Sequence, residues 1–297
     1  MILIADSGGT GTDWSLIPSP LRTGGMKGGL VHTCGLNPLH GLPTSEELRR
    51  ALITAGFPLP GREERENLSL FFYGAGCTSD QMPRMRAFLC ETFGCASEQV
   101  CVQSDMVGAA RAVQGDSPGL VAILGTGANA CYWDGRELHP GPRSLGYVLG
   151  DEGSGAYIGR LLLRAILRGD DAALAAQFEQ ETGLTYPDIL ERVYRRPGAA
   201  AFLAALAPFC ASHRQHPLVH EVLDRAFTHF AGELLMPLVA VWDCRSVGFV
   251  GSIARHFRPE LAEALGRHGI TISQVVARPI EALTDYHTRR RPHAGED

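Results

Sequence analysis

Two glycine–threonine segments are the residues of this chain whose types and spacing point most directly to chemistry. The first occupies residues 7–12 (Ser-Gly-Gly-Thr-Gly-Thr) and the second residues 125–128 (Gly-Thr-Gly-Ala). Glycines on both sides of a threonine let successive backbone N–H groups turn toward one point, and such a nest binds anions, phosphate among them. Each segment taken alone is equally compatible with an ordinary hairpin turn.

Asp105 is the candidate for acid–base chemistry. It follows a short apolar run and begins a pattern typical of a helix, so that Ser104-Asp105 is expected at a strand-to-helix junction. Ser104 could be only an N-cap there. The carboxyl end of a strand in an open α/β sheet is also where ligands bind, and a carboxylate near a hydroxyl is the base that phosphoryl transfer uses.

The elements around the two glycine segments repeat. An apolar strand at about 2–6 precedes the first turn and an alternating strand at 13–17 follows it; an apolar run at 121–124 precedes the second turn, and an alternating segment through Trp133 follows. Two copies of one pattern ~120 residues apart suggest a duplicated unit. One half could then bind one end of a polyphosphate, and the other half the other end.

The remaining pattern predicts further strands at about 29–34, 68–73, 99–103 and 270–273, and helices at 79–93, 104–113, 154–167 and from residue 280. A helical block at about 170–241 is interrupted by Pro187, Pro197 and Pro217. Residues 246–252 again read as strand, glycine turn and helix start. We expect a first domain at 1–115, joined by a C-terminal helix at about 280–297, and a second at 116–279 with a helical insertion at about 170–240.

Composition narrows the choice of function. The chain has 297 residues and a net charge of −5, which argues against non-specific nucleic-acid binding. No apolar run is long enough to span a bilayer and no basic segment opens the chain, so we expect no membrane partner and a cytoplasmic location. Lys27 is the one lysine of the sequence, and no Gly-x-x-x-x-Gly-Lys loop exists. Phosphates would have to be bound by backbone N–H groups and a metal.

Five motifs in order give the chain a family resemblance. They are 6–13 (Asp-Ser-Gly-Gly-Thr-Gly-Thr-Asp), 104–108 (Ser-Asp-Met-Val-Gly), 124–129 (Leu-Gly-Thr-Gly-Ala-Asn), 150–154 (Gly-Asp-Glu-Gly-Ser) and 248–252 (Gly-Phe-Val-Gly-Ser). Together they resemble N-acetylglucosamine kinases and the related BadF/BadG/BcrA/BcrD ATPases of the actin/hexokinase/heat-shock-chaperone ATPase superfamily. The resemblance covers nearly the whole chain. It implies an α/β fold of two ribonuclease H-like (actin-like ATPase) domains, with mixed five-stranded sheets flanking a central cleft.

The resemblance also assigns roles, with ATP and Mg²⁺ as cofactors and an amino sugar as substrate. Asp105 would accept the proton of the sugar hydroxyl, and Asp6 would hold Mg²⁺, usually through water. The residues implied for ATP and its phosphates are Ser7, Gly8, Gly9, Thr10, Gly11, Thr12, Gly125, Thr126, Gly127, Gly248, Gly251 and Ser252. The residues implied for the sugar are Asn37, Asp105, Thr126, Asn129, Gly146 and Asp151. Similar proteins are commonly homodimers.

Two departures from the family pattern leave alternatives open. Gly11 stands where the first turn usually carries Lys or Arg, and Ser144-Leu-Gly-Tyr147 replaces the Gly-Gly-Trp-Gly-like segment of animal kinases. The preferred function is phosphorylation of N-acetylglucosamine at a primary hydroxyl. The alternatives are a glucosamine kinase, a BadF-type ATPase that activates an iron–sulfur enzyme, and a non-catalytic sugar sensor.

Overall fold

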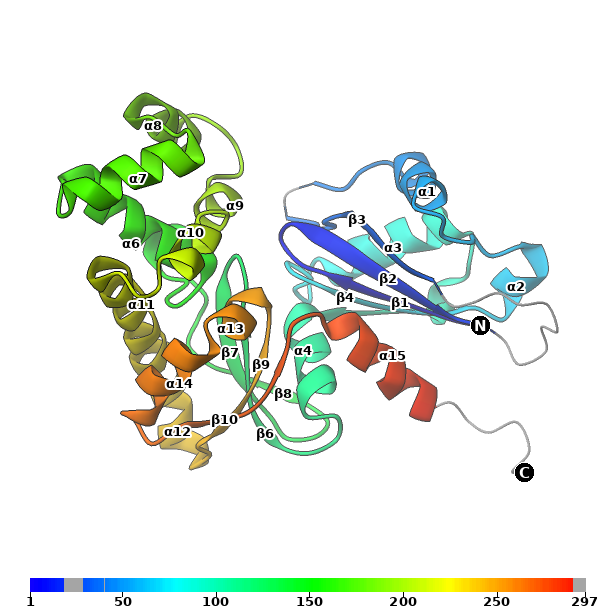
Figure 1. Ribbon diagram of the computed structural model, residues 1–297. Helices are drawn as coiled ribbons and strands as arrows, with labels where there is room; N and C mark the ends of the chain where they lie inside the picture. Colours follow the sequence, from blue (N-terminus) through cyan, green and yellow to red (C-terminus); the bar gives the residue numbers. More distant parts are fainter. Residues whose placement is uncertain (19–28, 40, 291–297) are drawn as a thin grey trace. The chain divides into compact units, whose positions relative to one another are not determined.

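The protein is described here from a computed structural model that covers residues 1–18, 29–39 and 41–290 (Figure 1). The chain forms two compact units, one made of Met1–Gly115 with the chain from Arg278 onward, the other of Asp116–Ala277. Lys27 and the part of the expected C-terminal helix beyond residue 290 lie outside the described residues. None of the helices within the described ranges is both long and apolar enough to cross a membrane.

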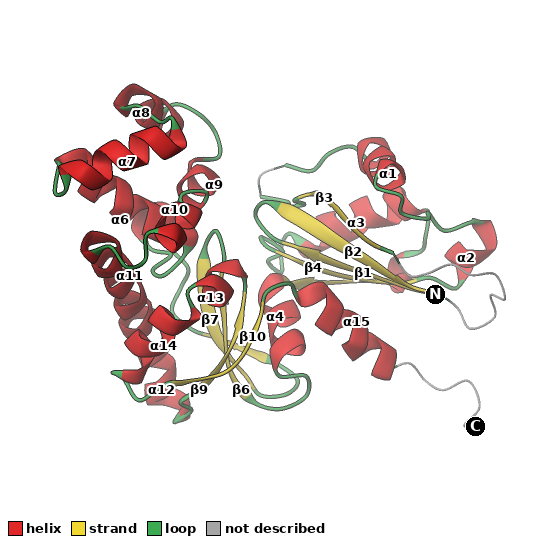
Figure 2. Cartoon of the chain, viewed as in Figure 1, coloured by secondary structure: helices red, strands yellow, loops and turns green. Residues whose placement is uncertain are grey.

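The first unit is built on a mixed sheet, drawn in yellow in Figure 2. Its strand order is β3-β2-β1-β4-β5. Three strands form an antiparallel meander, and two further strands run parallel to the first one. Their bounds are β1 (Ile2–Ser7), β2 (Gly11–Ile17), β3 (Leu30–Cys34), β4 (Ser69–Gly74) and β5 (Val100–Ser104). The glycine segment at 7–12 therefore joins the two antiparallel strands at the carboxyl end of β1.

The two faces of this sheet differ in what covers them. Leu3, Trp14 and Leu70 face a core shared with α1 (Ser45–Thr54) and α3 (Met82–Phe93). Ile4 and Tyr73 face the opposite way, toward α4 (Asp105–Val113) and α15 (Pro279–Arg289), where Ile280 and Leu283 pack on them. The short segments α2 (Arg62–Glu66) and η1 (Ser97–Gln99) complete the unit. Because side chains alternate along a strand, successive residues of each strand pack against the α1–α3 layer and the α4–α15 layer in turn.

The second unit repeats the same sheet, with the order β10-β9-β6-β7-β8. The central strand pairs antiparallel with a second and parallel with a third, as in the first unit. The bounds are β6 (Gly119–Leu124), β7 (Ala128–Trp133), β8 (Leu138–Pro140), β9 (Ser246–Val250) and β10 (Thr271–Val276). Within the described residues each unit thus has one five-stranded sheet of the same topology, which confirms the predicted duplication and the α/β fold class.

Helices account for the rest of the second unit and form most of its core. The bounds are α5 (Gly146–Leu149), α6 (Gly155–Arg168), α7 (Ala172–Thr182), α8 (Tyr186–Tyr194), α9 (Ala199–Ala204), α10 (Ala207–Ser212), α11 (Pro217–Phe230), the π-helical turn η2 (Ala231–Leu235), α12 (Met236–Trp242), α13 (Ser252–His256) and α14 (Arg258–Gly266). Gly159 of α6 allows a close helix crossing, because a Cβ there would lie 2.1 Å from the carbonyl oxygen of Leu203 in α9.

Two predicted boundaries are wrong by a few residues. The helix expected from residue 79 begins at Met82, since residues 79–81 form a turn and Pro83 occupies the first helical turn. The strand expected at 270–273 runs from Thr271 to Val276, with an irregular register between Ile272 and Gln274. The helical block is interrupted before Pro217, as predicted, because this proline occupies the first turn of α11.

Candidate active site

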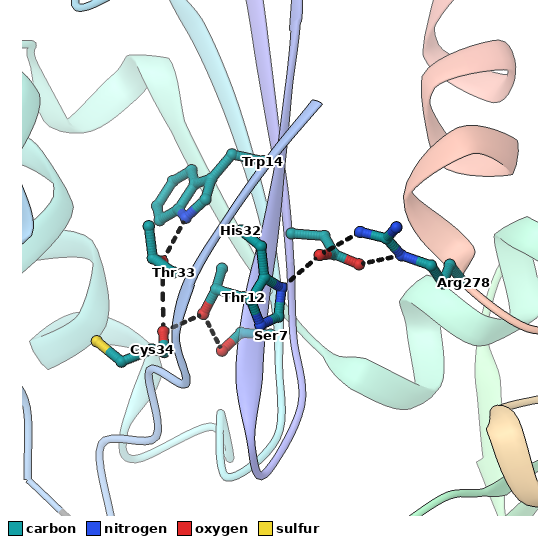
Figure 3. Close-up of polar contacts among 8 residues, drawn as sticks. Ser7, Thr12, Trp14, His32, Thr33, Cys34 and Arg278 are labelled. Atoms are coloured by element: carbon teal, nitrogen blue, oxygen red, sulfur yellow. Dashed lines mark hydrogen bonds and ion pairs between the residues drawn. The ribbon is translucent and has the colours of Figure 1, made fainter. Parts of the chain in front are cut away.

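The first glycine turn is held by side chains at its base and leaves its tip open. The Ser7 and Thr12 hydroxyls are 2.8 Å apart, and Thr12 donates to the Cys34 carbonyl at 2.9 Å (Figure 3). The backbone N–H of Leu36 donates to the Ser7 hydroxyl at 2.9 Å. Residues 8–10 at the tip are exposed. Fixed ends and an accessible backbone are what a phosphate-binding turn requires.

The two hydroxyl residues of this turn point to one face of the sheet and the acids to the other. Ser7 pairs with Thr12 in the β1–β2 ladder, and Asp6 pairs with Asp13 one position earlier. Directly opposite residues in an antiparallel pair share a face. Asp6 and Asp13 therefore lie on the face covered by α4 and α15.

Asp105 is the first residue of α4, directly after β5. The Ser104 side chain accepts the backbone N–H of Val107 at 3.4 Å, so Ser104 is the N-cap that the sequence suggested. The Asp105 Oδ1 atom accepts the N–H of Met106 at 2.9 Å. Burial raises the pKa of Asp105, and backbone hydrogen bonds only partly oppose this shift.

The pKa of Asp6, an acid of the same face, is also raised. Burial, followed by the charges of Asp105 and Asp13, raises the pKa of Asp6 to about 7, although Arg278 acts in the opposite direction. A carboxyl group that is half-buried beside two other carboxylates has a high electrostatic cost when ionised. A cation bound there would remove that cost.

The donor chemistry fits Mg²⁺. Carboxylate oxygens are its usual protein ligands, and Mg²⁺ normally keeps several waters and binds one or two carboxylates plus substrate phosphates. Within the described residues no group of three or more His, Cys, Asp or Glu side chains is placed to hold a metal ion. A single carboxylate, Asp6, next to the candidate phosphate turn suits the water-mediated role that the family resemblance implies.

Asp13 has the opposite electrostatic character. Arg278 donates to both of its oxygens, from Nε to Oδ2 at 3.0 Å and from Nη2 to Oδ1 at 2.7 Å, and His32 Nδ1 lies 2.7 Å from Oδ1. Figure 3 shows His32 and Arg278 on opposite sides of this carboxyl group. Burial alone would raise the pKa of Asp13, but the hydrogen bonds and charges of Arg278 and His32 lower it. Asp13 is therefore an ionised link between β2, β3 and the start of α15.

In the second unit, the Gly125–Gly127 turn is tied to the start of α6. The N–H of Gly125 donates to the Gly127 carbonyl at 3.0 Å. The N–H groups of Gly155 and Ala156 donate to the carbonyls of Gly125 and Thr126 at 2.8 and 3.1 Å. The turn thus has the fixed backbone that the first turn also has, here supplied by a helix N-terminus rather than by hydroxyls.

Gly251 lies against the same turn. It joins β9 to α13 with a φ of 118°, and a Cβ there would lie 2.2 Å from the carbonyl oxygen of Leu124. Only glycine combines this φ with so close an approach. Gly248 lies within β9 and Ser252 begins α13. Gly248, Gly251 and Ser252, which the resemblance implies for ATP, therefore follow one another through a strand, a turn and a helix start beside the Gly125–Gly127 turn.

Asp151 is the best-placed of the predicted sugar residues in this unit. It has a φ of 57°, which is strained for a residue with a side chain. Its carboxylate accepts a hydrogen bond from the Ala128 backbone, and a Cβ at Gly127 would lie 3.1 Å from its Oδ2. Burial nevertheless raises the pKa of Asp151. Backbone strain at a half-buried acid beside a glycine turn is typical of a ligand-binding position.

The other predicted sugar residues are divided between the two units. Asn37 is in the first unit, where its Oδ1 accepts the N–H of Leu39 at 2.9 Å and packs against Gly76. Asn129 in β7 accepts the N–H of Ala130 at 2.9 Å. Gly146, with a φ of 72°, begins α5 and is exposed. The structure therefore brings Asp151 and Thr126 to one turn, and Asp105 and Asp6 to one face of the other unit.

The sequence prediction assigned no role to His32 or Arg278. The strand at 30–34 gives no signal for His32, because its residues Leu-Val-His-Thr-Cys do not alternate between apolar and polar. Arg278 gives no local signal, since its partner Asp13 is 265 positions away in the chain.

Solved structures show what the chain is similar to. No protein-family model matches the sequence, and no curated protein matches it. A structure from Porphyromonas gingivalis named "Putative N-acetylglucosamine Kinase" is 38% identical, with a TM-score of 0.85 over 97% of this chain and 99% of the other. A structure of the same name from Chromobacterium violaceum is 20% identical, with a TM-score of 0.69 over 96% and 98%.

A more distant structure is similar in fold alone. It is a ROK family glucokinase from Streptomyces griseus, described in complex with glucose and AMPPNP, which is 16% identical with a TM-score of 0.53 over 93% of each chain. The 38% identity over nearly the full length of both chains, by contrast, establishes relationship. This protein belongs to the family of N-acetylglucosamine kinases and related BadF/BadG/BcrA/BcrD ATPases, within the actin/hexokinase/heat-shock-chaperone ATPase superfamily.

Proposed function

We propose that the protein is a kinase that transfers the γ-phosphate of ATP to a primary hydroxyl of an amino sugar, with N-acetylglucosamine as the first substrate to test. The observation that carries the proposal is the electrostatic coupling of Asp6 and Asp105 at one end of one sheet, beside an open glycine turn. Asp6 is suited to binding a cation, and Asp105 is suited to accepting a proton. The name of the 38% identical relative supports the choice of sugar.

Asp105 is the proposed general base. The hydrogen bond from Met106 orients its carboxyl group, and its raised pKa makes it a stronger base than an exposed aspartate. It accepts the proton of the sugar hydroxyl as the hydroxyl oxygen attacks the γ-phosphorus in line. A positioned base of this kind contributes roughly 10²- to 10⁴-fold to the rate.

Asp6 is the proposed Mg²⁺ residue. A Mg²⁺ ion bound to Asp6 through water would neutralise the negative charge that develops on the phosphate during transfer. The backbone of residues 7–12 contributes N–H groups to the same charge, since the sequence lacks a phosphate-loop lysine. The raised pKa of Asp6 means that ionisation of this residue and cation binding favour each other.

The remaining predicted residues are assigned by the same chemical reasoning. The Gly125–Gly127 turn is the proposed second phosphate turn, and Gly248, Gly251 and Ser252 are the proposed adenosine residues. Asp151, Asn129 and Gly146 with Asn37 of the first unit are the proposed sugar residues, because amide and carboxylate groups pair with hydroxyls and discriminate against analogues that leave them unpaired.

The decisive experiment measures ADP release and the phosphorylated product with N-acetylglucosamine, glucosamine, glucose and no sugar. Release that depends on N-acetylglucosamine is expected. Release independent of any sugar would indicate an ATPase activator, and no release with intact sugar binding would indicate a sensor.

The variant that tests the mechanism is Asp105→Asn. It should lower kcat by about 10²- to 10⁴-fold with little change in ATP affinity. The matched control is Asp80→Asn, because Asp80 is an exposed acid of the same unit. Turnover of the Asp105 variant at the control's rate would refute the assignment.

A further inference from the structure

The position of Gly11 in the first glycine turn is occupied by a side chain from another strand. A Cβ at Gly11 would lie 2.2 Å from Cε1 and 2.3 Å from Nε2 of His32, and 3.3 Å from the Thr33 carbonyl oxygen. Real Cβ atoms do not approach other atoms as closely as the first two distances. The His32 imidazole of β3 therefore lies directly over the Gly11 backbone, where a side chain at position 11 would begin.

The ring is fixed in this place by the neighbouring strand. Asp13 and His32 are directly opposite in the β2–β3 ladder, and Gly11 is two residues before Asp13 on the same face. His32 Nδ1 lies 2.7 Å from Asp13 Oδ1, and Arg278 holds the same carboxylate from its other side. Since the carboxylate is ionised, Nδ1 is the donor in this contact, and Nε2 is the nitrogen left beside Gly11.

The ring is also accessible. The His32 side chain is 63% exposed, although its partner Asp13 is only 12% exposed. A surface imidazole that is anchored through one nitrogen to a nearly buried, ionised carboxylate has its other nitrogen oriented for a second contact. That contact faces the turn whose backbone is the proposed phosphate site.

We propose that His32 is a phosphate-binding residue that takes the position a side chain at residue 11 would occupy, and that its Nε2 donates to a terminal phosphate of ATP at the 7–12 turn. The inference deepens the proposed function and rests on it. With Nδ1 donating to Asp13, an imidazole that also donates from Nε2 to a phosphate oxygen carries a proton on both nitrogens and a positive charge. The Arg278 guanidinium is paired with Asp13 rather than directed at the phosphate site.

The geometry makes a reciprocal prediction about residues 11 and 32. A long basic side chain at position 11 and the imidazole of residue 32 compete for the same space. Gly11→Lys alone should therefore not strengthen ATP binding, because the lysine displaces the ring. In the double variant Gly11→Lys with His32→Ala, the lysine enters an empty position and supplies the missing cation.

The experiment measures the affinities for Mg·ATP and for AMP by calorimetry, since AMP lacks the terminal phosphates. His32→Ala should weaken Mg·ATP binding about tenfold to a hundredfold, the range of one hydrogen bond to a charged group, and AMP binding less than twofold. His32→Gln, which keeps an amide donor for Asp13 but has no cation, should show the same selective loss and guards against misfolding. The double variant should regain most of the Mg·ATP affinity.

The matched control is His139→Gln. His139 also contacts a carboxylate, Asp134, at 2.8 Å, but on β8 of the second unit. The His139→Gln variant should leave the affinities for Mg·ATP and AMP unchanged. Equal losses for Mg·ATP and AMP in His32→Ala, or no loss for either, would overturn the inference. Sugar-dependent turnover of the wild type tests the proposed function separately. If the wild type shows such turnover and His32→Ala keeps the wild-type affinity for Mg·ATP, the proposed function stands and only the role of His32 is refuted.

Discussion

Replacing Asp6 by Asn should abolish turnover and at the same time stabilise the first unit above neutral pH. The pKa of Asp6 rises from its ordinary value of 3.8 to about 7 in the folded protein. Below pH 4 the group is protonated in both states and contributes nothing. Between pH 4 and 7 the unfolded chain ionises first, so folding is disfavoured by about 1.4 kcal/mol per pH unit, and above pH 7 the cost levels off at about 4 kcal/mol.

The pH profile of the wild type alone does not reveal this cost, because His287 acts with the opposite sign. Burial, with the charges of Arg111 and Arg290, lowers the pKa of His287 from 6.5 to about 4. The neutral ring therefore contributes stability above pH 6.5 that is lost as the pH falls toward 4, by about 3 kcal/mol. The two effects nearly cancel between pH 4 and 7. The quantity to measure is the difference between the variant and the wild type, in which the His287 contribution is common to both.

Urea unfolding between pH 4.5 and 8, without Mg²⁺ or nucleotide, gives that difference. Trp14 is fully buried in the first unit, so a background with Trp133→Phe and Trp242→Phe makes its fluorescence report that unit alone. The stability gain of Asp6→Asn should grow with pH and reach several kcal/mol at pH 8. The control Glu98→Gln removes an exposed acid and should show no such trend. A gain that is the same at pH 4.5 and 8, or a loss at pH 8, would refute the electrostatic reasoning.

Two further substitutions test the packing of each unit. His287→Gln should stabilise the first unit relative to the wild type increasingly as the pH falls from 6.5 to 4, because the cost of protonating His287 disappears. An amide can still contact the Tyr73 hydroxyl, which lies 2.8 Å from His287 Nε2. A difference in urea midpoint that does not grow as the pH falls would contradict this. Gly251→Ala should destabilise the second unit by about 1–3 kcal/mol and weaken nucleotide binding, because its φ of 118° and the 2.2 Å approach to the Leu124 carbonyl exclude a Cβ. Thermal unfolding measures the loss of stability, and calorimetry with Mg·ATP measures the loss of affinity. A variant equal to the wild type in both would disprove the strain argument.

The parts of the candidate site that could be predicted from the sequence are those set by local patterns. An apolar strand that enters a glycine turn marks the ends of β1 and β6, and Ser104-Asp105 marks the start of α4. These signals need only a few adjacent residues, since strand periodicity, turn chemistry and capping are local properties. The family motifs had the same character, and the 38% identity to a solved structure bears out the family that they indicated.

The parts that could not be predicted depend on register between distant segments. His32 reaches Gly11 only because β3 pairs with β2 so that His32 faces Asp13, and a shift of one residue would present Val31 or Thr33 instead. Arg278 reaches Asp13 only because α15 returns to the sheet of the first unit. Neither contact leaves a periodic signal in the sequence. From the sequence alone, Gly11 in place of a basic residue indicated only that a phosphate-binding side chain was missing.

The core of the first unit is what enforces the register that the site needs. Trp14 is fully buried between Phe57 and Phe93 and its indole N–H donates to Thr33 at 2.8 Å, so β2 must present Trp14 to the α1–α3 face. Because side chains alternate, Asp13 is then on the opposite face. Slipping β2 by one residue would expose the indole and bury an ionised carboxylate in the apolar core, and both changes are strongly unfavourable. The acids, the imidazole and the arginine thus share one face because the large apolar residues between them occupy the other.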